Sequence, residues 1–128
     1  MALNKFTTAI SKGDVLAVER TSATPDAWRT ATTGDVKPFA IAGEAAAATD
    51  ITVSVGLAGW WWLQANGAID PNQFVMPDTN GNVKAWDGAN ENTRVGLYLG
   101  HPGELGSHTV TATAAIAGDI ILVDINRR

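Results

Sequence analysis

The stretch Gly13-Asp14-Val15-Leu16-Ala17-Val18 indicates how this chain folds, because a Gly-Asp pair leads directly into a short apolar segment. The same pair stands at Gly34-Asp35 before Val36, and at Gly118-Asp119 before Ile120-Ile121-Leu122-Val123. Glycine adopts a positive φ without strain, and an aspartate side chain can bond to the backbone two residues on. The pair therefore turns the chain and starts a strand, so its repetition predicts a body built from β-strands.

Further strands are predicted from short apolar or alternating segments separated by turns rich in Gly, Asn, Asp and Pro. Ile51-Thr52-Val53-Ser54-Val55 alternates apolar and polar residues, as a strand with one buried face does. The helix candidate Gly43–Thr49 spans at most about two turns. We expect an all-β, single-domain sandwich or barrel of about eight or nine short strands. The predicted strands are Val15–Arg20, Val36–Ile41, Ile51–Val55, Trp60–Leu63, Gln73–Met76, Val83–Trp86, Arg94–Leu99, Thr109–Thr113 and Ile120–Ile125.

Asn80-Gly81 lies between two of these segments and predicts a β-hairpin, because Asn-Gly accommodates the positive φ values of a tight turn. Asp78, Asn80 and Asn82 also resemble a calcium loop. Their spacing differs from that of an EF-hand, in which the glycine follows the third ligand and a glutamate stands near position twelve. We therefore interpret this segment as a turn, and we expect no metal site.

The first twelve residues carry no Gly-Asp pair and no strand-like alternation, so we expect an extended N-terminal arm over 1–12 and a β domain over 13–128. The arm is either a frayed terminus or a segment that orders on the surface of a partner. In the second case, the contact residues would be Ala2, Leu3, Asn4, Lys5, Phe6 and Ile10.

The composition excludes several classes of function. The chain of 128 residues contains no cysteine, which excludes disulfides and thiolate chemistry, and its formal net charge of −4 disfavours nucleic acid as a partner. We expect no signal peptide and no membrane segment, and hence assembly in a cytoplasm. Charged residues make up only 17% of the chain, which fits either a compact β protein with threonine-rich faces or a surface covered by other chains.

The sequence contains no recognisable catalytic motif. Its two histidines, His101 and His108, flank a loop in which Glu104 is the nearest candidate for a third zinc ligand. We interpret them as two solvated loop histidines, and a small hydrolase using these three residues is the remaining enzymatic hypothesis. We therefore expect a protein that is not an enzyme and that needs no cofactor.

The run Trp60-Trp61-Trp62 is the most unusual feature of the chain. On a strand, Trp60 and Trp62 point to one face and Trp61 to the other, so a single core cannot take all three. The second face could be covered by a loop or the arm, or it could contact another subunit, because tryptophan is enriched at the centres of interfaces. We take Trp60, Trp61, Trp62 and Phe74 as candidate interface residues.

A sugar-stacking platform is the third interpretation of the tryptophan run. Trp60 and Trp62 would then present their rings to a glycan, with Gln64 and Asn66 nearby as hydrogen-bonding groups. This alternative makes the chain a carbohydrate-binding or adhesin module.

Over roughly residues 12 to 125, the order of turns and strands resembles the small capsid decoration, or head cement, proteins of tailed bacteriophages. The triple tryptophan and the insertion-like loop Ser22–Thr33 depart from that family's pattern. The segments that carry the resemblance are Val36–Ala42, Ile51–Val55, Phe74–Asp78, Asn80–Val83 and, most specifically, Asn92-Thr93-Arg94-Val95-Gly96-Leu97.

The resemblance implies a non-enzymatic β protein, commonly trimeric, on the outer surface of the virion. Such a protein would clamp subunits of the major capsid protein and stabilise the shell against the pressure of packaged DNA. The arm residues Ala2–Phe6 and Ile10 would then bind the capsid, while the tryptophans and Phe74 would form oligomer or partner contacts. The partners expected are the major capsid protein and two further copies of this chain, with no nucleic acid and no membrane.

Overall fold

The computed structural model describes residues 2–4, 10–18, 27–45, 51–53, 55–102, 110–111 and 114–125. These ranges contain β-strands and two single-turn 3₁₀ helices but no α-helix, so the all-β prediction is confirmed. The elements are β1 (Ala2–Asn4), β2 (Val15–Val18), β3 (Ala27–Thr30), β4 (Phe39–Ala42), β5 (Ile51–Val53), β6 (Val55–Gly56), β7 (Gly59–Gln64), β8 (Phe74–Pro77), η1 (Thr79–Gly81), β9 (Val83–Ala85), η2 (Glu91–Thr93), β10 (Gly96–Pro102), β11 (Val110–Thr111) and β12 (Ile120–Ile125).

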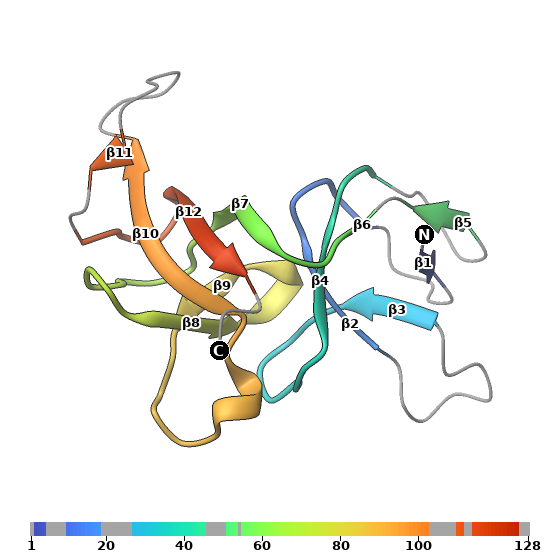
Figure 1. Ribbon diagram of the computed structural model, residues 1–128, viewed down its shortest axis with the longest axis horizontal. Helices are drawn as coiled ribbons and strands as arrows, with labels where there is room; N and C mark the ends of the chain where they lie inside the picture. The colour runs from blue at the N-terminus through green and yellow to red at the C-terminus, as the bar shows by residue number, and fades with distance from the viewer. Residues whose placement is uncertain are drawn as a thin grey trace.

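Each half of the chain forms its own sheet. The first has the strand order β5-β1-β3-β2-β4-β6, and the second has the order β7-β12-β10-β8-β9, with β11 paired to β10. The sheets lie along the long axis of the molecule, the first on the right and the second on the left in Figure 1, and β7 lies near the centre of the view. Neighbouring strands are antiparallel except for β1 and β3, which are parallel.

The main core is built from both sheets. In β2 and β4 the odd-numbered residues join this core, whereas Leu16, Ala40 and Ala42 join a second, smaller cluster on the opposite face. This division follows the two-residue period of a strand. Complete burial of a large apolar side chain contributes about 1.5–3 kcal/mol, so the core is the main source of stability. Its members include Val15, Ala17, Phe39 and Ile41 of the first sheet and Leu63, Val75, Tyr98, Ile121 and Val123 of the second.

The second sheet curls until its two outer strands meet. Ala65, just after β7, forms a parallel bridge with Val83 of β9, and the Asn66 N–H donates to the Val83 carbonyl at 2.7 Å. The unpaired edges of β7 and β9 are therefore partly closed against each other, which protects them from pairing with other chains.

All three Gly-Asp turns share one geometry. Their glycines have φ between +91° and +94°, which confirms that a left-handed residue is needed there. The sequence pattern predicts that each aspartate bonds to the backbone two residues after it. Instead, both its N–H and its carboxylate bond to the backbone of the residue three positions before it. Each aspartate N–H donates to the carbonyl of the residue three positions before it at 3.1 Å, and each aspartate carboxylate accepts from the N–H of that earlier residue at 2.8–3.0 Å. The pairs are Asp14 with Ser11, Asp35 with Thr32, and Asp119 with Ile116.

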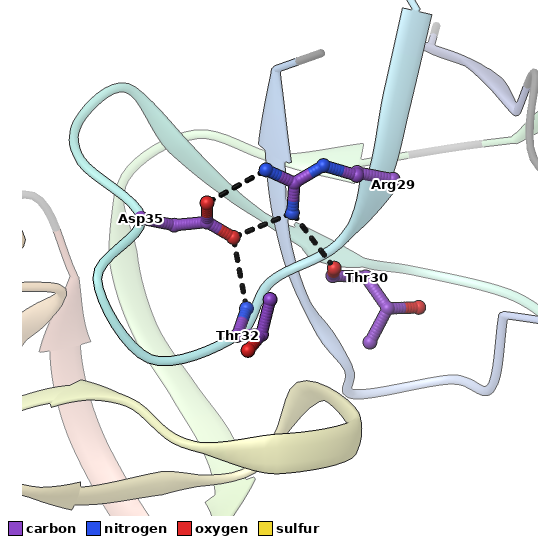
Figure 2. A network of polar contacts seen from close by, with 4 residues as sticks. All are labelled: Arg29, Thr30, Thr32 and Asp35. Atoms are coloured by element: carbon purple, nitrogen blue, oxygen red, sulfur yellow. Dashed lines mark hydrogen bonds and ion pairs between the residues drawn. The ribbon is translucent and has the colours of Figure 1, made fainter.

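The second of these turns carries an additional ion pair, drawn in Figure 2. Arg29 of β3 donates from its two terminal nitrogens to the two carboxylate oxygens of Asp35, at 2.5 and 2.6 Å, and also to the carbonyl of Thr30. The bidentate pair connects β3 to the turn that leads toward β4. Partial burial acts to raise the pKa of Asp35, but the hydrogen bonds from Arg29 and Thr32, with the Arg29 charge, lower it overall.

The described parts of the expected arm belong to the β body. Ala2–Asn4 form β1, which lies between β3 and β5, and Ile10 is only 2% exposed, in the smaller apolar cluster. The expectation of an arm separate from the body over 1–12 therefore fails at these positions, because the ladder satisfies their backbone groups and the cluster buries Ile10. Lys5 and Phe6 lie outside the described residues.

The other differences from the predicted strands have local causes. Strand β4 starts at Phe39 rather than Val36 because Pro38 has no N–H to donate to a ladder. The segment Ile51–Val55 is divided, since β5 pairs with β1 whereas β6 pairs with β4. The predicted hairpin is confirmed as β8 and β9, closed by η1. Of the helix candidate, Gly43 and Glu44 form a bend, and 46–49 lie outside the described residues.

Candidate functional site

Strand β7 places its three tryptophans on two faces. Trp61 packs against the main core, and its Nε1 donates to the carbonyl of Ala58 at 2.8 Å. Gly56 makes room for this indole, because a Cβ atom at residue 56 would lie 1.9 Å from the ring. Trp61 is therefore a structural residue, held by the core and by the absence of a side chain at Gly56.

Trp60 and Trp62 point to the opposite face and are 68% and 46% exposed. Strand β12 continues this face, because Trp62 lies opposite Leu122 and Gln64 lies opposite Ile120, which is 45% exposed. We call the four residues Trp60, Trp62, Ile120 and Leu122 the Trp face. Residues directly opposite in an antiparallel pair are close neighbours, but Leu122 is only 9% exposed. Trp60, Trp62 and Ile120 therefore supply the exposed apolar area of the Trp face, on the order of 300 Å².

A groove of about 340 Å³ adjoins the Trp face at Trp62. Four segments of the chain form it: the turn 11–14, strand β7, the turn 79–82 and Ile120 at the start of β12. The two turns pack closely at Gly81, where a Cβ atom would lie 2.7 Å from the Asp14 carboxyl carbon. We call this the polar groove, and the residues used below are Asp14, Trp62, Gln64, Asn80 and Asn82.

The polar groups of the groove differ in burial and in hydrogen bonding. Burial raises the pKa of Asp14, although the hydrogen bond from the Ser11 N–H opposes this effect. Within the part of the chain that the structure describes, the side-chain amides of Gln64, Asn80 and Asn82 make no hydrogen bond. The groove therefore presents three amide groups and one partly desolvated carboxylate beside an indole ring.

Trp62 also lines an adjoining apolar hollow of about 360 Å³, together with Lys12, Gly13, Ala42 and Ile120. Its apolar floor continues the Trp face toward the first sheet. A partner that covers Trp62 could therefore contact both halves of the molecule.

Phe74, the fourth predicted interface residue, lies in an aromatic stack within the second sheet. Its ring meets Trp86 edge-on at a centroid distance of 6.1 Å, and the Arg94 guanidinium lies 4.3 Å from the Phe74 centroid and 5.1 Å from that of Trp86. Trp86 is anchored by hydrogen bonds from its Nε1 to the Asn90 carbonyl and to Thr93 Oγ1. No local pattern in the sequence predicts that Arg94 joins these two rings.

Of the three candidate catalytic residues, the structure describes only His101. His101 is half-buried on β10, opposite Thr111, while Glu104 and His108 lie outside the described residues. Within the described ranges, no group of three histidine, cysteine, aspartate or glutamate side chains could hold a metal ion. Asp78, from the calcium-like segment, instead accepts hydrogen bonds from Asn66 Nδ2 at 2.8 Å and Thr33 Oγ1 at 3.3 Å.

Of the predicted interface residues, the structure brings together only Trp60 and Trp62. The sequence did not predict the polar groove, since its parts lie at four separate places in the chain. No family model, curated protein or solved structure matches this chain. Among the described residues, no helix is long and apolar enough to cross a membrane.

Proposed function

We propose that this protein is a structural decoration protein, which binds the outer surface of a tailed-phage head as a homotrimer and stabilises the shell without catalysing a reaction. The Trp face is the observation that carries the proposal, because two tryptophans side by side in water are typical of a surface that a partner covers. The resemblance of the turn and strand pattern to head decoration proteins supplies the class of partner.

The Trp face is suited to rigid docking. Strand β7 pairs with β12 along its whole length, from Gly59 opposite Ile125 to Gln64 opposite Ile120, and β12 is paired in turn with β10. A surface held in this way loses little conformational entropy when it binds. Its apolar burial, at about 25 cal/mol per Å², contributes several kcal/mol per subunit.

Such a contact is weak for one subunit, so the proposed trimer matters energetically. When three copies are joined, the second and third contacts form at a high effective concentration. In this proposal the major capsid protein is the partner, the protein is located on the outer surface of the virion, and the segment with Lys5 and Phe6 keeps its predicted role in capsid contact. Ala2–Asn4 and Ile10 are reassigned to the stability of the body, because they are part of a sheet and a core cluster.

The proposal is tested by sedimentation of the purified protein alone and with heads. We expect a mass in solution of three times 13.4 kDa, and we expect the trimer to pellet with DNA-free heads assembled from the major capsid protein of the same genome. The reason is that a trimer can cover apolar area on several capsid subunits at once. A protein that remains in the supernatant at micromolar concentrations, with heads in excess, would exclude a decoration role.

A further inference from the structure

The polar groove holds hydrogen-bonding groups that the fold does not use. Asp14 is partly buried in the turn that leads into β2, and its carboxylate lies against Gly81 of the neighbouring turn. Gln64 at the end of β7 and Asn82 after η1 line the same groove, and within the described residues their amides bond to no other group. Amide groups left free at the side of an aromatic ring are available to a ligand.

The chemistry of this groove matches that of a sugar ring. A pyranose has an apolar face of C–H groups, which packs on an indole, and an equator of hydroxyl groups, each of which donates and accepts hydrogen bonds. Each amide supplies two donors and one acceptor, and a carboxylate supplies acceptors. The volume of about 340 Å³ lies in the range of small-molecule sites.

Other ligand classes fit the groove less well. Lys12 is its one cationic side chain, and Asp14 brings a negative charge to the same groove, so the groove offers little to a phosphate group. A divalent cation would find only one carboxylate there, since Asp14 is the single acidic residue among the lining residues.

We propose that the polar groove binds a neutral saccharide unit, with Trp62 stacking on the ring and Gln64, Asn80, Asn82 and Asp14 bonding its hydroxyl groups. This site differs from a platform made by Trp60 and Trp62, because Trp60 does not line the groove and because the Asn66 amide is already bonded to Asp78. Saccharide binding is an activity in addition to head decoration, and it requires no capsid.

The test uses the full chain in solution, titrated separately with maltohexaose, cellohexaose and N-acetylchitohexaose. We expect at least one of them to change the tryptophan fluorescence with saturation, at a dissociation constant on the order of 1 mM. Trp62→Ala should weaken that binding at least about tenfold, and the double variant Gln64→Ala/Asn82→Ala roughly three- to tenfold, as expected for lost hydrogen bonds. Calorimetry on the same samples measures both affinities without relying on fluorescence.

Trp60→Ala is the matched control, since it removes a more exposed indole on the same strand that does not line the groove. The affinity of Trp60→Ala for the oligosaccharide should stay within about twofold of that of the wild type. The proposal of a saccharide site is wrong if none of the three oligosaccharides binds at 10 mM, which is on the order of ten times the expected dissociation constant. If Trp60→Ala loses as much affinity as Trp62→Ala, the groove is not the site. Neither result bears on the proposed head decoration, which is measured with heads and without sugar.

Discussion

At the scale of single residues, the ion pair between Arg29 and Asp35 should make stability depend on pH. The two side chains are 24% and 16% exposed, so water screens their interaction only in part. We expect Asp35→Asn to lower the free energy of unfolding by about 1–2 kcal/mol at pH 7, because the variant loses the charge that Arg29 contacts. Urea denaturation of both proteins measures the difference.

The direction of the pH effect follows from the lowered pKa of Asp35. The folded protein holds this proton less tightly than the unfolded chain, so the contribution to stability is complete above the ordinary value of 3.8 and is lost as pH falls through the folded pKa. The difference in the free energy of unfolding between wild type and Asp35→Asn should therefore shrink at pH 3 and below. Asp70→Asn, at an exposed position, serves as control, and a difference that stays constant or grows as pH falls would contradict the assignment.

The sequence predicted some of these residue-level features. Positive φ at the Gly-Asp turns follows from the chemistry of glycine, and all three glycines adopt it. The bonds of the aspartates back to the residue three earlier depend on the exact turn, and the pairing of Arg29 with Asp35 depends on the position of β3. The need for Gly56 under the Trp61 indole is a matter of tertiary packing, which no local pattern encodes.

At the scale of elements, β1 changes what truncation should do. Because β1 lies between β3 and β5, its removal takes away both ladders and leaves β5 without its partner. We expect a variant lacking residues 1–4 to be less stable by about 2–4 kcal/mol, whether or not it contacts a head. Urea denaturation and amide hydrogen exchange of β3 measure this, and an unchanged midpoint with unchanged protection would show that β1 contributes nothing to the body.

Sequence reasoning located most strands but missed β1 and β3. Each of the nine predicted segments contains at least part of a strand, because turn residues and alternation are local signals. Ala27–Thr30 follows Pro25-Asp26 within a stretch that looked like an inserted loop, and Ala2–Asn4 is too short to show alternation. Both are strands because of the neighbours with which they pair, and this information is not local.

At the scale of the whole molecule, two sheets share a core and leave one strongly apolar face exposed. Alternation along β7 predicted that Trp60 and Trp62 would share a face opposite to Trp61, and the structure has this arrangement. The polar groove and the stack of Phe74, Trp86 and Arg94 could not be predicted, because they combine segments that only the fold brings together.

The Trp face is the surface on which the proposed function depends, so the most direct measurement is the affinity of Trp-face variants for heads. Wild type, the double variant Trp60→Ala/Trp62→Ala and the control Ile116→Ala are each sedimented with the same DNA-free heads over a range of concentrations. Ile116 is an exposed apolar residue outside the Trp face, so its variant should bind as the wild type does. The double variant should keep its fold and lose at least about a hundredfold in affinity. Equal binding by the double variant and the wild type would contradict the assignment of the Trp face as the head-binding surface.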